Sequence, residues 1–261
     1  MRAETKAALA AVEVGLDLAR RRVGAERITS KGGRDLVTAT DIAVEDAIRS
    51  TLLAHFPEWT VVDEERGGED QIGDRPYWLV DPICGTRNFA SGLPLYAVNV
   101  ALVENGQVTV AAVGEGGFGE RFYAERGQGA YQVTADGSVR LHASDTSHVV
   151  GVSVGAIDPG RHHDHSAEFV REALLANRWD LRVLGTTAVF AYLAAGRIAG
   201  YLLFKISSPV HTAAGCLLAE EAGVLVTDLR GEPWMVETDN FLAAASPTLQ
   251  AELLTMVAAT A

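Results

Sequence analysis

The chain has few cysteines, little positive charge and no long apolar run, and each shortage excludes a class of protein. Two cysteines, Cys84 and Cys216, stand among 261 residues, which is too few for a disulfide framework and suits a reducing cytoplasm. The net charge of −12 argues against a nucleic-acid partner, because a phosphate backbone requires a basic surface. No apolar run approaches the roughly 20 residues of a membrane span, and the N-terminal residues do not form a signal peptide. We therefore expect a cytoplasmic protein without membrane or nucleic-acid partners.

The amino-acid composition is that of an ordinary globular protein, with 48% apolar and 21% charged residues. Within residues 1–145 the apolar spacing predicts helices over 4–22 and 40–55, with Thr40 or Asp41 at the start of the second. Residues 31–33 are expected to form a loop. The pair Asn105-Gly106 is a strong hairpin signal between two of the predicted strands, which cover 60–62, 77–80, 96–103, 108–113, 122–124 and 130–132. This first half is predicted to be two helices on an antiparallel sheet.

Residues 146–261 alternate strands with helices, which indicates an α/β layer packed against the first half as one unit. Strands are predicted at 149–154, 181–184, 201–204, 225–228 and 241–245. Helices are predicted at 167–175, 187–195, 210–222 and 248–256. The stretch 155–166 is expected to be a polar loop, so its histidines 162, 163 and 165 are interpreted as solvated surface or a lid.

Acidic residues fall at predicted strand and helix ends, where their side chains can converge. An apolar strand delivers Asp81 at its tip, Pro82 turns the chain, and Gly85-Thr86 opens a tight turn with unpaired backbone N–H groups. Such a turn suits a cation and a phosphate together. Carboxylate and carbonyl oxygens are the ligands that Mg²⁺ takes. Glu220-Glu221 is interpreted as helix surface, and Cys216 as a buried apolar residue.

Five segments in order give the chain a resemblance to the inositol monophosphatase family of Mg²⁺-dependent sugar and polyol phosphatases. They are Asp35–Asp41, Phe56-Pro57, Asp63-Glu64-Glu65, Trp78–Phe89 and Ser208–Gly223. The resemblance covers nearly the whole length. It implies a layered α-β-α-β-α sandwich, a homodimer, and a small anionic substrate that is a sugar or polyol phosphate monoester.

The resemblance also implies roles for single residues. Glu64 and Asp81 match metal ligands, and the carbonyl of Ile83 matches a third ligand to the first metal ion. The N–H groups of Gly85 and Thr86 match those that hold the phosphate, and Thr86 with Asp41 matches the pair that orients the attacking water. Arg87, next to Thr86, is expected either to meet the anionic substrate or to pair with a surface acid.

The chain departs from the family pattern at three places. Cys84 and His211 each stand where the family has an aspartate that ligates the second metal ion together with the residue matching Asp81. The third departure removes an acidic contact to polyol hydroxyls, because Phe204-Lys205 occupies that region; Lys205 is instead predicted to contact the substrate.

Three hypotheses follow from the altered subsite. In the first, the enzyme remains a phosphatase that uses Mg²⁺, or Mn²⁺ or Zn²⁺ because thiolate and imidazole favour softer ions. Alternatively, only the first metal ion binds and turnover is slow. In the second, Cys84 and His211 form a nucleophile–base pair for acyl transfer or related chemistry, without need of a metal ion. In the third, the protein is a catalytically inactive binding protein.

Overall fold

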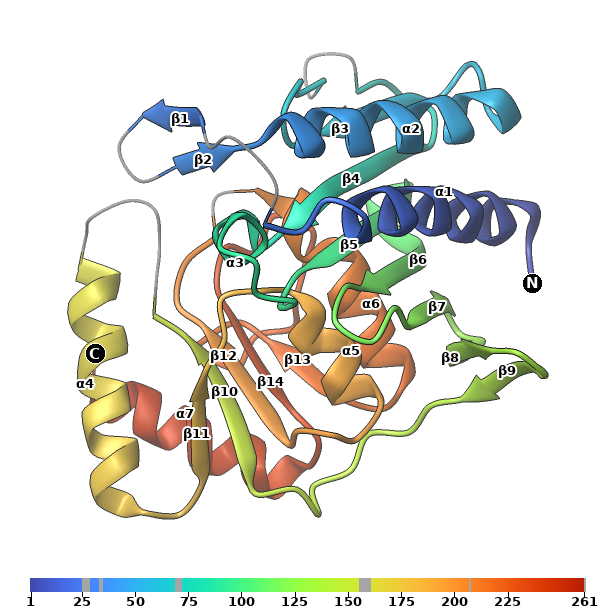
Figure 1. The fold of residues 1–261 in the computed structure, drawn as a ribbon. Helices are drawn as coiled ribbons and strands as arrows, with labels where there is room; N and C mark the ends of the chain where they lie inside the picture. The colour runs from blue at the N-terminus through green and yellow to red at the C-terminus, as the bar shows by residue number, and fades with distance from the viewer. Residues whose placement is uncertain (25–28, 33–34, 69–71, 155–160, 207, 261) are drawn as a thin grey trace.

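The computed structural model describes residues 1–24, 29–32, 35–68, 72–154, 161–206 and 208–260. Two sheets dominate the fold, and helices lie outside and between them (Figure 1). A short antiparallel pair near the N-terminus, β1 (Thr29–Gly32) with β2 (Asp35–Val37), stands apart from both sheets. None of the helices in the described ranges is long and apolar enough to cross a membrane.

The first sheet has seven strands arranged in chain order. They are β3 (Thr60–Asp63), β4 (Tyr77–Cys84), β5 (Ala97–Glu104), β6 (Gln107–Glu115), β7 (Arg121–Glu125), β8 (Gly129–Thr134) and β9 (Gly137–Arg140). The predicted Asn105-Gly106 turn is confirmed, because both residues have positive φ and join β5 to β6. The expectation of a purely antiparallel sheet is wrong at one edge, where β3 runs parallel to β4.

Alternating residues of this sheet face two separate helical layers. Val98, Val100 and Leu102 point towards α1 (Ala3–Arg20) and α2 (Ala39–His55). Their neighbours on the opposite face pack against α5 (Ala188–Ala194) and α6 (Ala213–Glu221). Because side chains alternate between the faces of a strand, the long apolar runs of β5 and β6 are what a sheet covered on both faces requires.

The second sheet has five strands in the order β11-β10-β12-β14-β13. They are β10 (Val149–Ser153), β11 (Asp180–Val183), β12 (Gly200–Leu203), β13 (Leu225–Thr227) and β14 (Phe241–Ala244). Strand β10 is parallel to both β11 and β12, so the carboxyl ends of these three strands meet at one edge. The outer face packs on α4 (Arg161–Ala176) and α7 (Pro247–Ala259), and the inner face on α5 and α6.

The layers therefore follow the expected α-β-α-β-α order, from α1 and α2 to α4 and α7 (Figure 1). The first sheet ends at Arg140 and the second begins at Val149. The division of the chain after residue 145 into two halves packed as one unit stays a proposal.

Three local predictions need correction. The predicted loop at 31–33 is partly strand, since Lys31 and Gly32 lie in β1, and Gly33 lies outside the described residues. The predicted loop at 155–166 ends early, because α4 begins at Arg161. The predicted helix 210–222 is two elements, a 3-10 turn η2 (Pro209–His211) followed by α6.

Candidate active site

Strand β4 carries three of the predicted site residues, Asp81, Ile83 and Cys84, at its carboxyl end. Asp81 pairs with Asn99 of β5 and Cys84 pairs with Ala97, so a register shift separates the two pairs. A bulge of this kind bends the strand and re-aims its side chains. The Asp81 carboxylate, the Cys84 thiol and a ring nitrogen of His211 consequently lie within 4.8 Å of one another.

The Asp81–His211 contact is the strongest interaction in this cluster. His211 Nδ1 lies 2.8 Å from Asp81 Oδ2, and Asp81 is fully buried. Burial opposes the charged imidazolium, but the charge of Asp81 and its hydrogen bond outweigh that effect and raise the pKa of His211 well above its usual value. The contact with Asp81 therefore favours the charged imidazolium form of His211.

The Cys84 thiol lies close to the same imidazole. Burial raises the pKa of Cys84 to about 11, and the negative charge of Asp81 acts in the same direction. Hydrogen bonds with His211 and Thr187 favour the thiolate but do not compensate for burial. The thiol is therefore protonated at neutral pH, when the imidazole that would have to accept its proton is already charged.

Asp41 and Thr86 meet from different elements. Thr38 caps α2, and its backbone N–H and hydroxyl both donate to Asp41 Oδ2, at 2.9 Å and 2.5 Å. The helix was thus predicted to begin one residue late, and its cap is Thr38, not Thr40 or Asp41, although Asp41 does take part in the capping box. Its other oxygen faces the Thr86 hydroxyl at 3.4 Å, and that hydroxyl also lies 3.1 Å from the Ile83 carbonyl oxygen. Burial raises the pKa of Asp41 to about 6, although the Thr38 hydrogen bonds lower it.

Gly85 makes the tight turn between β4 and the short helix α3 (Thr86–Ala90). Its φ of 102° is a left-handed conformation, and a Cβ at this position would lie 2.8 Å from the Leu95 carbonyl oxygen. Only glycine fits such a place without strain. The side chain of Asn88 holds the turn by donating to Leu95 O at 2.8 Å and to Gly185 O at 3.1 Å.

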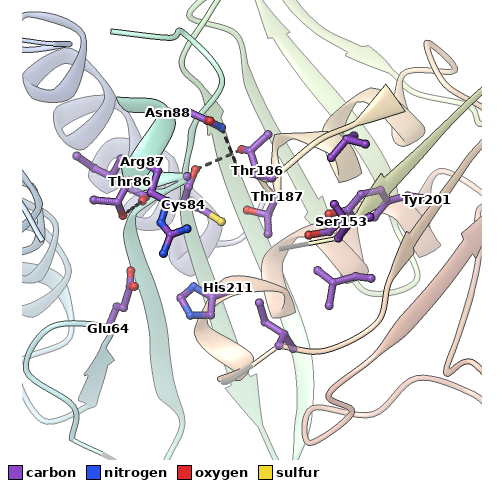
Figure 2. Close-up of a pocket in the computed structure, with 17 residues that line it drawn as sticks. Glu64, Cys84, Thr86, Arg87, Asn88, Ser153, Thr186, Thr187, Tyr201 and His211 are labelled. Atoms are coloured by element: carbon purple, nitrogen blue, oxygen red, sulfur yellow. Dashed lines mark hydrogen bonds between the residues drawn. The ribbon is translucent and has the colours of Figure 1, made fainter. Parts of the chain in front are cut away.

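These groups surround a cavity of about 310 Å³. Of the predicted site residues, seven line it: Glu64, Ile83, Cys84, Gly85, Thr86, Arg87 and His211. Figure 2 shows Glu64, Thr86 and Arg87 on one side of the cavity, with His211 nearby and Ser153 and Tyr201 across from them. Asp41 and Asp81 are fully buried behind this lining.

Lys205 lies elsewhere, since its ammonium pairs with Asp239 and it does not line the cavity. The histidines 162, 163 and 165, which were predicted to lie in a surface loop, lie in helix α4 instead. There the His165 ring packs edge-on against Phe204, with Nε2 3.0 Å from the Val257 carbonyl oxygen. His165 is therefore a packing residue between helices, not part of a lid.

Sequence reasoning missed Thr186 and Thr187, which connect the second half of the chain to the site. Thr186 donates to the Cys84 carbonyl oxygen at 3.2 Å, and Thr187 accepts from Asn99 at 2.8 Å. Both line the cavity. The available signal was their place between a strand and a helix, the position where polar loop residues of an α/β layer gather.

The donor atoms can be tested for their fit to metal ions. Asp81 Oδ1 is buried and has no hydrogen-bond partner within the described ranges, and Ile83 and Glu64 line the cavity. Three oxygen donors of this kind fit a hard divalent cation. The set of Asp81, Cys84 and His211 fits Mg²⁺ poorly, because a thiol and an imidazole replace oxygen ligands.

Comparisons with known proteins show which family the chain is similar to. The model of the inositol monophosphatase family matches residues 1–260. "Nus factor SuhB" of Vibrio cholerae is 33% identical over 249 residues, 94% of this chain and 91% of its own length. A "Fructose-1,6-bisphosphatase/inositol-1-monophosphatase" of Thermotoga maritima is 33% identical over 212 residues, 81% of this chain and 78% of its own.

Two solved structures share the fold over nearly the full length. The IMPase of Thermotoga maritima superposes with a TM-score of 0.84 at 28% identity, covering 97% of this chain and 95% of its own. The extragenic suppressor protein SuhB of Bartonella henselae gives a TM-score of 0.86 at 27% identity, covering 98% of each chain.

Proposed function

The chain belongs to the inositol monophosphatase family, and from that premise we propose that it is a metal-dependent phosphatase with one metal subsite retained and the other altered. It is a phosphatase-like enzyme by its relatives. The proposal specifies the reaction as hydrolysis of a small-molecule phosphate monoester. Sugar and polyol phosphates are the first substrates to test, because the family resemblance points to them.

One observation carries the proposal, the unpartnered buried oxygen of Asp81. A buried carboxylate oxygen without a donor is costly, so such atoms in native proteins need an explanation. A cation held by Asp81 Oδ1, Glu64 and the Ile83 carbonyl would supply the missing partner. When bound, this Mg²⁺ would stabilise negative charge that develops on the phosphate.

The remaining roles belong to residues of the chain itself. The Thr86 hydroxyl lies between Asp41 Oδ1 and the Ile83 carbonyl, a place from which it can orient a water molecule for attack on phosphorus. The backbone N–H groups of Gly85 and Thr86 would hold the phosphate oxygens, because N–H groups at the start of a helix lack partners within it. Arg87 lines the same side of the cavity and would add positive charge towards an anionic substrate.

At the altered subsite, we propose that His211 replaces a metal ion as the cation beside Asp81. An imidazolium 2.8 Å from the carboxylate already balances its charge. A Zn²⁺ or Mn²⁺ ion there would require a neutral imidazole and, for Zn²⁺, a thiolate. Such an ion would therefore have to displace the proton that His211 holds beside Asp81.

Cysteine catalysis is the second candidate function, because Asp81, His211 and Cys84 lie close together. A carboxylate orients one ring nitrogen while the thiol lies beside the imidazole. The electrostatics oppose it, because a thiol with a pKa near 11 is almost entirely protonated at pH 7. We therefore place phosphatase activity first.

The test is phosphate release from a panel of sugar and polyol phosphates with Mg²⁺, Mn²⁺, Zn²⁺ or EDTA. We expect release with Mg²⁺ that is lost in EDTA and falls at least a hundredfold in Asp41→Asn and Thr86→Val. Glu58→Gln is the matched control, because this exposed carboxylate pairs with Arg75 at the surface. No release with any metal would refute the proposal.

A double variant tests the altered subsite. Cys84→Asp with His211→Asp restores two carboxylates, and we expect it to need a higher Mg²⁺ concentration for full activity, because a second ion must then bind. Unchanged Mg²⁺ dependence would contradict the role given to His211. Assembly as a homodimer is also proposed, and light scattering of the purified protein tests it.

A further inference from the structure

The second sheet forms one wall of the cavity, and this wall is mostly apolar. Its lining residues lie on the parallel strands β10, β11 and β12 or just beyond them: Ser153, Val154, Val183, Tyr201, Leu203 and Ile206, with Gly185, Thr186 and Thr187 in the loop after β11. Ligands of open α/β sheets bind at this edge, where neighbouring connections leave in opposite directions. Strand β10 lies at such a point, between β11 and β12.

The four polar side chains of this wall, Ser153, Thr186, Thr187 and Tyr201, are already engaged within the protein: Thr186 with the Cys84 carbonyl oxygen and Thr187 with Asn99. The Tyr201 hydroxyl donates to the Leu184 carbonyl oxygen at 3.3 Å and also interacts with the Ser153 hydroxyl; Figure 2 shows the two side chains next to each other. Among the described residues, no charged side chain of β10, β11 or β12 lines the cavity. A ligand group that meets this wall therefore meets mainly hydrocarbon.

The opposite side of the cavity is polar and charged, with Glu64, Thr86, Arg87 and His211 in its lining. The cavity is thus divided into a half suited to a phosphate and a half suited to an apolar group. Its volume of about 310 Å³ holds both, since a cavity of roughly 150 Å³ is enough for benzene.

We propose that the substrate of this site is the phosphate monoester of an apolar, ring-sized alcohol, in preference to a sugar or polyol phosphate. The inference rests on the proposed phosphatase function and specifies its substrate class. A polyol placed against this wall would lose hydrogen bonds to water without gaining partners, which costs roughly tenfold in affinity for each buried hydroxyl. An apolar ring at the same place gains by leaving water.

Cyclohexyl phosphate and inositol 1-phosphate are a matched pair for the test. Both are esters of a six-carbon ring, and they differ in five ring hydroxyls. We expect kcat/KM for cyclohexyl phosphate to exceed that for inositol 1-phosphate at least tenfold. Binding is measured separately by calorimetry with the phosphonate analogues of both, which cannot be hydrolysed, and the dissociation constants should differ in the same direction.

A variant pair tests the wall itself. Val183→Thr adds a hydroxyl without changing shape, and Val183 is 61% exposed, so folding should tolerate the change. We expect it to reduce the cyclohexyl preference at least threefold. Val139→Thr is the control, because Val139 is 56% exposed on β9 and does not line the cavity.

The outcomes separate this inference from the proposed function. Hydrolysis of both esters with a cyclohexyl preference below tenfold, or with the reverse preference, overturns the inference and leaves the phosphatase in place. Selective binding of the cyclohexyl phosphonate without hydrolysis of either ester overturns the phosphatase and supports the apolar subsite. Failure to bind or hydrolyse any of the four compounds overturns both.

Discussion

Replacing His211 by alanine should destabilise the protein far more than an ordinary substitution. Asp81 is fully buried and the His211 side chain is only 12% exposed, so the variant leaves a buried carboxylate without its counter-charge. Removing one partner of a buried ion pair costs about 3–5 kcal/mol. With an unfolding entropy of about 2.1 cal/mol/K per residue, this corresponds to a fall in Tm of roughly 5–9 °C for a chain of this length.

The assay is thermal unfolding followed by circular dichroism in EDTA, with His142→Ala as control, because His142 is exposed. His211→Gln, whose amide can still donate to Asp81, should recover part of the loss. Adding Mg²⁺ should raise the Tm of His211→Ala more than that of the wild type if Asp81 is a metal ligand. A Tm within about 2 °C of the wild type in EDTA would refute the claim that His211 balances the charge of Asp81.

Three further predictions concern single residues. At pH 8, Cys84 should react with iodoacetamide at least about a hundredfold more slowly than a free cysteine, because its pKa is about 11; mass spectrometry of the modified peptide checks this, and faster reaction would favour the cysteine-catalysis hypothesis. Gly85→Ala should cost at least about 2 kcal/mol and abolish phosphate release, since its φ of 102° and the contact with the Leu95 carbonyl leave no room for a methyl group; a variant with wild-type Tm and activity would contradict the turn geometry. Burial raises the pKa of Glu45 from 4.5 to about 7, so its ionisation destabilises the fold as pH rises from about 4.5 and does so fully above about 7. Glu45→Gln should therefore gain stability relative to the wild type between pH 5 and pH 8, on the order of 1–3 kcal/mol, and urea unfolding that shows no such gain would contradict this assignment.

Much of the fold follows from local signals in the sequence. The helices at residues 4–22 and 40–55 and the Asn105-Gly106 hairpin were predicted from apolar period and turn chemistry, and the structure has them close to those bounds. The parallel pairing of β3 with β4 was not predicted, because strand direction is set by the path of the chain between them. The break at Thr212 was not predicted either, since Val210 continues the apolar pattern of the helix.

The candidate site shows the same division between local and distant information. The motif around Asp81 and Gly85 supplied five of the seven predicted residues that line the cavity, residues 83–87. Thr186 contacts the Cys84 carbonyl across 102 positions of sequence, and a contact of that separation leaves no local pattern. Lys205 was predicted at the substrate only because it lies in the region where the family has an acidic contact to polyol hydroxyls, whereas the structure pairs it with Asp239.

The helices between the two sheets are synthesised later than the first sheet, whose second face they cover. The first sheet is complete at Arg140, but α5 and α6, which cover its second face, end at Glu221. At 5–20 residues per second, roughly 4–16 s pass in which buried side chains such as Val113 and Phe122 have no cover. This is the interval in which chaperones should bind the nascent chain. His211 emerges just before α6, so the candidate active site is completed in the same step that closes the core, and we expect no nascent chain to be active while that face is still exposed.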